Sequence, residues 1–508
     1  MNMGLAIRAA QRARSIKLLS ALLAITLFHA GSTDAAEPTV VGPIAGRPVL
    51  DLGQFDISAL GYVTEEFFIS GAASSYKPVS TPDDGRWVAE VAESAPFTTR
   101  VVVVRPRDSA KFNGSVLVEW LNVTGGGDLS VDWKVTHRLL VRDGFAYVGV
   151  SAQRVSIEGS GTALPGAEPL KKADPARYGA LAHPGDAFAY DIFSQAGKAV
   201  RNASGVRLLG PLSPQRVLAA GESQSAGFMT AYVNAIDPLS KVFDGFFIHS
   251  RSGGSAPIEG RAAVREGAPP APARGPVKIR PDVRVPVMTL LAETDVMGRG
   301  VGGYFGARQP DSDRFRAWEI AGTAHGDTYI AKAGYVDSGL LSPEELAAAF
   351  AATDVAFGQK MKSLMNAAPQ HHYVAQAALH HLNRWVKDGQ LPPKGDPLTV
   401  VAGAAQGDPP GLARDKYGNA LGGVRSPWMD VPTATLSGTS LGGEGFAFLF
   451  GSTVPFDAAT LKTLYPGGRA DYLAKFKQSL DRAIAAGFLL NHDAAEIMAL
   501  AAAMYPQK

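Results

Sequence analysis

The sequence predicts an α/β protein with a mostly parallel sheet that helices cover on both faces. Three observations predict it. Apolar runs without alternation recur along the chain, helical patterns separate them, and turn-forming residues bound both kinds of segment. The chain has 508 residues, of which 19% are charged and 46% hydrophobic. That balance is typical of a globular protein and excludes a disordered one.

The N-terminal segment differs from the rest of the chain. Several basic residues between positions 8 and 17 precede an apolar stretch at 18–28, which is too short to span a bilayer. Small residues follow, with cleavage expected after Ala35 or Ala36. We expect residues 1–36 to be a secretory signal peptide and the protein to be periplasmic or secreted. A membrane anchor is the alternative interpretation, and we expect no membrane span once the signal is removed.

Charge and cysteine content exclude several function classes. The net charge is +2, and no basic block stands out beyond the N-terminus, so a nucleic-acid partner has no electrostatic support. The chain has no cysteine, which excludes a thiol nucleophile, iron–sulfur chemistry and cysteine-type zinc sites. The histidines lack metal spacing such as H-E-x-x-H. We therefore expect neither a metal nor an organic cofactor.

The expected elements follow in order. Strands are expected at 101–105, 115–123, 145–150, 216–220, 242–249, 285–292 and 316–320. Helices are expected at 186–199, 226–235, 342–351, 374–386 and over most of the chain from 458. Ser342 is a suitable N-cap for its helix because two glutamates follow in the first turn.

The mature chain is expected to be one domain, at 37–508. Residues 252–284 are rich in proline, glycine and arginine and interrupt the strand pattern, so they predict an irregular insertion. We expect this insertion to border the entrance of a site. We expect residues 390–508 to form a C-terminal elaboration with a hairpin turn at Gly418 and Asn419.

A candidate nucleophile lies in VLAAGESQSAGFM at 217–229. A serine nucleophile on a strand-to-helix turn is usually marked by G-x-S-x-G. If the strand ends before Gly221, Ser223 lies at the apex of the turn and Ser225 is small enough to replace the second glycine. Ser225 is the alternative nucleophile, but it would require Glu222 and Ser223 to extend the strand.

Base and acid candidates follow in the order that the α/β-hydrolase fold uses, which is serine, then acid, then histidine. His325 in WEIAGTAHGD comes after an expected strand and sits in a loop of small residues. Asp295 in ETDV lies just beyond the edge of the preceding strand, where its carboxylate can turn toward His325. Glu293 lies nearer the strand end and is the second candidate for the acid.

Two further motifs could complete the site. The loop TGGGD follows an early strand, and the backbone amides of Thr124, Gly125 and Gly126 are candidate oxyanion donors. The amide of Gln224, directly after the nucleophile, is the other donor expected. Arg425 and Trp428 could line the site from above, with the arginine meeting a substrate carboxylate. The alternative is a structural hairpin in which the arginine forms an ion pair.

The chain contains the motifs GESQSAG, TGGGD, DIFSQA, ETDV, RQPDSDRFRAWEIAGTAHGD and RDKYGNALGGVRSPWMDVPTA. Taken together, these motifs resemble a bacterial family known as alpha/beta hydrolase domain proteins. The resemblance extends from about position 43 to the last helices. It implies a serine hydrolase with the α/β-hydrolase fold and its own C-terminal elaboration, in which Ser223 matches the nucleophile and His325 the base. It does not specify a substrate.

These patterns predict an exported hydrolase of small carboxylic esters. Ser223 attacks the ester carbonyl, His325 moves the proton, Asp295 orients His325, and an acyl-enzyme forms that water releases. A lactone, an amide or a peptide could be the substrate of the same residues. A non-catalytic binding protein of the same fold is the other alternative.

Overall fold

The computed structural model describes residues 37–160, 167–201, 205–260, 275–298, 302–403 and 410–506. These residues belong to one compact unit at 37–508. The expected signal peptide lies outside the described residues, as does the middle of the expected insertion, at 261–274. Across the described ranges, no helix has the length and apolar character needed to cross a membrane.

Within the described residues, nine strands form one sheet in the order β1-β2-β3-β5-β4-β6-β7-β8-β9. Three strands at one side are antiparallel, and the six that follow in the sheet are parallel to one another. The predicted α/β class with a mostly parallel sheet is therefore confirmed. The strands are β1 (Thr39–Val41), β2 (Tyr62–Ser80), β3 (Val88–Pro106), β4 (Ser115–Trp120), β5 (Ala146–Val150), β6 (Arg216–Glu222), β7 (Gly245–His249), β8 (Val287–Ala292) and β9 (Phe315–Ile320).

The long antiparallel pair β2–β3 was not predicted beyond residues 101–105. Both strands have 19 residues. Only the 101–104 stretch of β3 is an unbroken run of fully buried valines. The other half of β3 is mostly exposed and contains Glu, Ser and Ala, so it lacks the continuous apolar pattern that marks a buried strand.

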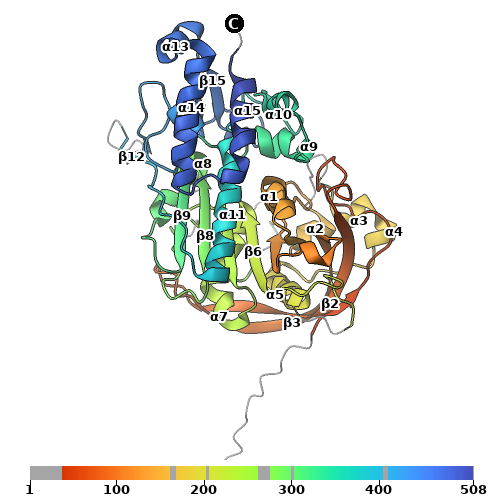
Figure 1. Cartoon of the computed structure of the whole chain (residues 1–508). Helices are drawn as coiled ribbons and strands as arrows, with labels where there is room; N and C mark the ends of the chain where they lie inside the picture. The colour runs from red at the N-terminus through yellow and green to blue at the C-terminus, as the bar shows by residue number, and fades with distance from the viewer. Residues whose placement is uncertain are drawn as a thin grey trace, which may run out of the picture. The chain divides into compact units, whose positions relative to one another are not determined.

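Helices cover the sheet on both faces (Figure 1). On one face, α1 (Val131–Arg142) and α11 (Gln370–Asp388) pack in a core that includes Leu218 of β6. On the other, α5 (Ala189–Arg201) and α6 (Gln224–Ala231) pack in a core that includes Val217. Successive strand residues enter opposite cores because side chains alternate across a sheet. Burial of each such side chain contributes about 1.5–3 kcal/mol.

The C-terminal part adds helices and the two-stranded sheets β12–β13 and β14–β15 to this body (Figure 1). The predicted cap of α10 (Pro343–Phe350) is confirmed, since the Ser342 hydroxyl accepts the Glu345 N–H at 3.2 Å and Glu345 accepts the Ser342 N–H at 2.8 Å. The remaining helices and strands are α2 (Arg154–Glu158), α3 (Leu170–Ala173), α4 (Pro175–Tyr178), α7 (Asp237–Ser240), α8 (Glu293–Met297), α9 (Gly334–Val336), α12 (Pro427–Asp430), α13 (Ala458–Leu464), α14 (Gly468–Ala485), α15 (Ala494–Met504), β10 (Val355–Ala356), β11 (Gln359–Lys360), β12 (Val400–Val401), β13 (Gly411–Leu412), β14 (Ala434–Ser437) and β15 (Ser452–Pro455).

Candidate active site

Ser223 lies alone between β6 and α6, at a sharp strand-to-helix turn. Its backbone is left-handed, with φ 57° and ψ −114°, a conformation that costs a non-glycine residue about 1–3 kcal/mol. The turn is fixed by the Ser223 N–H, which donates to the His249 carbonyl at 2.9 Å. The strand extends two residues beyond its predicted end at 220, so the turn falls on Ser223 itself.

The neighbours of this turn explain the altered G-x-S-x-G pattern. A Cβ at Gly221 would lie 2.8 Å from Met229 Cγ and 3.0 Å from the Ser225 carbonyl oxygen, so only glycine fits there. Ser225 is completely buried, and its hydroxyl donates to the Leu121 carbonyl at 3.3 Å. Ser223 lines a cavity and Ser225 does not, so the structure exposes the first serine and packs the second into the core.

His325 and Asp295 lie against each other. His325 Nδ1 is 2.6 Å from Asp295 Oδ1. The other oxygen, Asp295 Oδ2, accepts the Ala292 N–H at 2.7 Å, which holds the carboxylate at the start of α8. The His325 N–H in turn donates to Thr294 Oγ1 at 3.2 Å. Backbone contacts therefore fix both the acid and the imidazole.

Glu293, the alternative acid, has a different environment. Its carboxylate accepts the N–H groups of Gly322 at 2.6 Å and Gly438 at 2.9 Å. Both oxygens are thus occupied by backbone donors, and the carboxylate holds the loop after β9 to the C-terminal part. Of the two candidates for the acid, the structure brings only Asp295 to His325.

A second carboxylate faces the other edge of the imidazole. His325 Nε2 lies 3.3 Å from Glu222 Oε1. Burial alone would lower the pKa of His325, but the charges of Asp295 and Glu222 outweigh it and raise that pKa to about 9. Burial raises the pKa of Glu222 to about 8, against the opposing attraction of His325. No role for Glu222 is predicted from the sequence.

These groups share a cavity of about 270 Å³. Its lining residues are Thr124, Ser223, Gln224, Ser250, Ser252, Thr294, Asp295, Gly298, His325, Phe446, Phe448 and Leu449. Ser250 has a left-handed φ of 54°, and its buried hydroxyl has no hydrogen-bond partner among the described residues. The cavity therefore combines the candidate nucleophile, base and acid with an apolar wall and a free hydroxyl.

The expected oxyanion donors are only partly brought together. Gln224 and Thr124 line the cavity, but Gly125 and Gly126 do not. The Gly126 N–H donates to the Val123 carbonyl at 3.0 Å, so the glycines close a turn instead of facing the cavity. The Thr124 N–H donates to Asn122 Oδ1 at 2.8 Å. As the first residue of α6, Gln224 has an N–H without an acceptor inside the helix.

Arg425 and Trp428 are not at the cavity. Arg425 pairs with Asp430 at 2.7 Å and donates to two backbone carbonyls. Trp428 is buried and stacks on Tyr373 at a ring distance of 6.0 Å. The structural alternative, a loop held by an ion pair, therefore describes this segment.

A different stretch of the C-terminal part reaches the cavity. Phe446, Phe448 and Leu449 form its apolar wall. The run FAFLF at 446–450 follows a glycine-rich segment, and this apolar cluster is the signal in the sequence that could have pointed to a contact.

The predicted insertion at 252–284 meets the cavity at its first residue, Ser252. Its other described residues pack elsewhere, with Ile258 and Ile279 buried in the core on the α5 and α6 face of the sheet. The position of the insertion at an entrance remains a prediction for residues 261–274.

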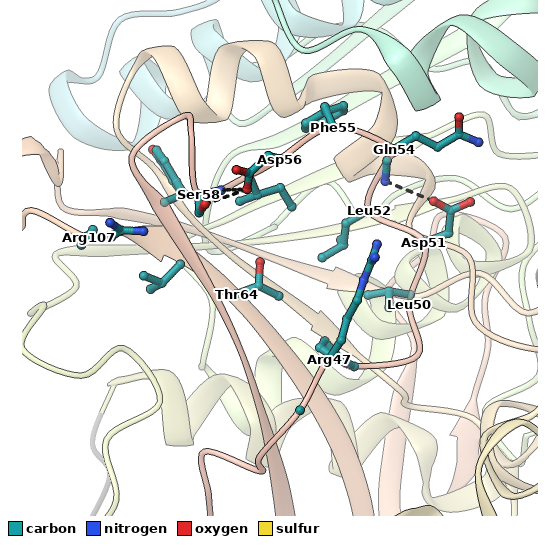
Figure 2. Close-up of a pocket in the computed structure, with 16 residues that line it drawn as sticks. Arg47, Leu50, Asp51, Leu52, Gln54, Phe55, Asp56, Ser58, Thr64 and Arg107 are labelled. Carbon is teal, nitrogen blue, oxygen red and sulfur yellow. Dashed lines mark hydrogen bonds between the residues drawn. The ribbon is translucent and has the colours of Figure 1, made fainter.

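A larger cavity of about 890 Å³ lies in the N-terminal segment, lined mainly by residues 46–58 (Figure 2). Arg47 and Arg107 lie on different sides of it, and Asp56 is bound to the hydroxyl and amide of Ser58. None of its described lining residues is a histidine. Volume alone does not mark a reactive site, and we place the candidate site at the smaller cavity, where acid, histidine and strained serine meet.

The parallel sheet, its two helical layers and a serine on the turn after a central strand define a protein of the α/β-hydrolase class. The chain belongs to the alpha/beta hydrolase domain family, whose model matches residues 32–499. No curated protein sequence matches the chain.

Solved structures show more distant similarity. An esterase structure from Rhizomucor miehei is 14% identical, with a TM-score of 0.31 over 63% of this chain and 85% of that one. Acetyl xylan esterase 1 from Thermoanaerobacterium sp. is 11% identical, with a TM-score of 0.25 over 51% and 74% of the two chains. Similarity at this level says nothing about the substrate of this chain.

Proposed function

We propose that this protein is an exported serine hydrolase that cleaves carboxylic esters, with Ser223 as nucleophile, His325 as base and Asp295 as the group that orients the base. The observation that carries the proposal is the 2.6 Å contact between His325 Nδ1 and Asp295 in the cavity that the strained Ser223 lines. Export rests on the basic and apolar pattern of residues 1–36.

The proposed reaction proceeds through an acyl-enzyme. Ser223 Oγ attacks the ester carbonyl while His325 Nε2 accepts the hydroxyl proton, and Asp295 stabilises the imidazolium that results. His325 then protonates the leaving alcohol, and water, activated by the same nitrogen, releases the acid. In the described structure the Ser223 hydroxyl makes no hydrogen bond, and such contacts often tighten only when substrate is bound.

Charge on the carbonyl oxygen needs preorganised donors. The free N–H of Gln224 at the start of α6 is the first of them, and the positive end of that helix supports it. The Thr124 N–H is the second candidate, provided that it exchanges Asn122 for the oxyanion. Loss of one such donor typically costs about 10²–10³ in kcat.

The cavity supports a small substrate with an apolar part. Its volume of about 270 Å³ lies just below the range of about 300–1,000 Å³ that is typical of ligand sites. Phe446, Phe448 and Leu449 offer an apolar wall, whereas the Ser250 hydroxyl is available for one polar group of the substrate. We expect short acyl chains to be preferred.

A fluorophosphonate probe tests the nucleophile directly. Wild-type protein and Ser225→Ala should gain one adduct, located on Ser223 by peptide mass spectrometry, and Ser223→Ala should gain none. Ser225→Ala is the matched control because its hydroxyl is buried and does not line the cavity. A folded wild-type sample without an adduct would overturn the proposal in favour of a non-catalytic binding protein.

The bond cleaved is tested with a substrate panel. Wild-type protein and Ser223→Ala are compared on p-nitrophenyl esters of increasing acyl length, on aliphatic lactones and on anilides. We expect Ser223-dependent turnover that is fastest for short esters. Faster turnover of a lactone or an anilide would keep the nucleophile and replace the ester assignment.

A further inference from the structure

Glu222 is buried directly before the candidate nucleophile. Its residue exposure is 4%, and its Oε1 lies 3.3 Å from His325 Nε2. This nitrogen is the one that must accept the proton of Ser223 in the proposed reaction. In the structure Nε2 therefore has a carboxylate partner, while the Ser223 hydroxyl has no partner among the described residues.

Asn122 fixes the other oxygen of Glu222. Asn122 Nδ2 donates to Glu222 Oε2 at 3.0 Å and to the Glu222 carbonyl at 3.1 Å. Asn122 Oδ1 accepts the Thr124 N–H at 2.8 Å. A continuous set of contacts therefore runs from the candidate oxyanion loop through Asn122 and Glu222 to the Nε2 edge of His325.

Several ionisable groups surround Glu222. His325 from the loop after β9 attracts its negative charge, whereas Asp295 of α8, Asp132 of α1 and Glu119 of β4 repel it. Because burial also disfavours the charged form, an ionised Glu222 depends on a cation beside it. The His325 imidazolium is the attractive charge in this set.

We propose that Glu222 is a positioning residue for the base: its carboxylate holds the Nε2 edge of His325 beside Ser223 and, through Asn122, fixes that edge relative to the loop at Thr124. This inference rests on the proposed function. Asp295 cannot position the Nε2 edge, because it contacts only the Nδ1 edge of the imidazole. Glu222 does not itself touch the reacting bond.

The consequence can be measured as a pH profile. The acidic limb of kcat/KM reports ionisation of the base in the free enzyme. Glu222→Gln removes a negative charge from the Nε2 edge, so the imidazolium loses its proton more readily and the limb should move to lower pH by about one unit. Glu222→Asp keeps the charge but withdraws it by one methylene, and its limb should fall between those of wild type and Glu222→Gln.

Glu293→Gln is the matched control. Glu293 is a buried glutamate at the same edge of the sheet, and it contacts backbone N–H groups instead of His325. Its acidic limb should coincide with that of the wild type. If the loss of any buried carboxylate moved the acidic limb, Glu222→Gln and Glu293→Gln would show the same shift. Equal shifts in these two variants would overturn the inference.

The remaining outcomes of this experiment also test the role of Glu222. An acidic limb of Glu222→Gln that coincides with the wild type overturns the role of Glu222 while leaving a Ser223-dependent hydrolase intact. If Glu222→Gln does not fold, Glu222→Asp decides alone, and an unmoved limb overturns the inference. Failure of the proposed function is recognised separately, by full hydrolysis in Ser223→Ala.

Discussion

Two networks of histidine and carboxylate lie near the carboxyl edge of the sheet, and only one of them contributes lining residues to the cavity of about 270 Å³. The cavity network consists of Asp295, His325 and Glu222, and the His325 side chain is 13% exposed. Its imidazole is held at both edges by carboxylates. Both carboxylates favour the protonated form of this imidazole.

The sealed network consists of Asp132, His249, His371 and Asp327, all buried. His249 Nδ1 lies 2.9 Å from Asp132, His249 Nε2 lies 3.0 Å from His371 Nε2, and His371 Nδ1 lies 2.9 Å from Asp327. Here each imidazole faces one carboxylate and one imidazole. The chemical groups are the same as in the cavity network, but none of these four residues lines the cavity of about 270 Å³.

The pKa values of His325 and His249 shift in opposite directions because the groups around the two imidazoles differ. The charges of Asp295 and Glu222 outweigh burial and raise the pKa of His325 to about 9. Burial, reinforced by repulsion from His371, lowers the pKa of His249 well below its ordinary value. Burial also raises the pKa of Asp132 to about 8, as burial does for Glu222 beside His325. Burial lowers the pKa of both imidazoles, and the carboxylates that face His325 reverse this effect there.

The largest effect expected is from His325. His325→Gln should lower kcat for a short aryl ester by about 10⁵–10⁶, as loss of the base does where serine and histidine act as a unit. His371→Gln removes a histidine from the sealed network and should lower the free energy of unfolding by about 1–3 kcal/mol, because His249 and Asp327 each lose a buried partner. Its kcat should stay within about tenfold of the wild type.

Steady-state kinetics and urea unfolding on the two variants separate these results. Equal losses of activity in both would remove the distinction between the networks. A stable and fully active His325→Gln would remove His325 from the reaction.

The two aspartates that face Nδ1 atoms give the next test. Asp295→Asn should lower kcat by about 10⁴, since an amide neither fixes the reactive tautomer nor stabilises the imidazolium. Asp132→Asn keeps an oxygen for His249 Nδ1 and should change kcat by less than about tenfold. The same ester assay measures both variants.

Glu293→Gln completes this set, because Glu293 is the other acid at the end of β8. It should retain kcat and lose about 1–3 kcal/mol of stability, since an amide has a single oxygen for two backbone donors. A fall in kcat as large as that of Asp295→Asn would assign the acid to Glu293.

Chemical patterns in the sequence were sufficient for the parts of the site that lie within short segments. The run 216–220 predicted a strand, and the structure has it as the start of β6. Gly221 and Ser225 predicted a turn with room only for small residues, and a Cβ at Gly221 would lie 2.8 Å from Met229 Cγ. The order of serine, acid and histidine selected the residues that the structure brings together at one cavity.

Contacts between distant segments could not be predicted from such patterns. Glu222 and Asn122 are 100 positions apart, and their hydrogen bonds depend on the pairing of β4 with β6. The wall residues 446–449 come from the C-terminal part, where no periodic pattern points to the cavity. Arg425 has the composition of a binding residue, yet Asp430, five positions away, pairs with it. Residue type identified candidates, and only the fold decided their partners.

The smallest effect expected is on the pH dependence of stability, where the two networks should differ in sign. The folded-state pKa of His325, about 9, lies above the unfolded value of about 6.5, so bound proton stabilises the fold. This contribution is complete below about pH 6.5 and is lost as the pH rises through about 9. The folded-state pKa of His249 is depressed. Its neutral form therefore stabilises the fold above about pH 6.5, and that contribution is lost as the pH falls.

Urea unfolding at several pH values tests this difference. Relative to the wild type, His325→Gln should flatten the loss of unfolding free energy on the alkaline side by about 3 kcal/mol. His249→Gln should flatten the loss on the acidic side. If both variants flatten the same side, the two histidines carry the same charge in the folded protein, and the electrostatic contrast between the cavity network and the sealed network is wrong.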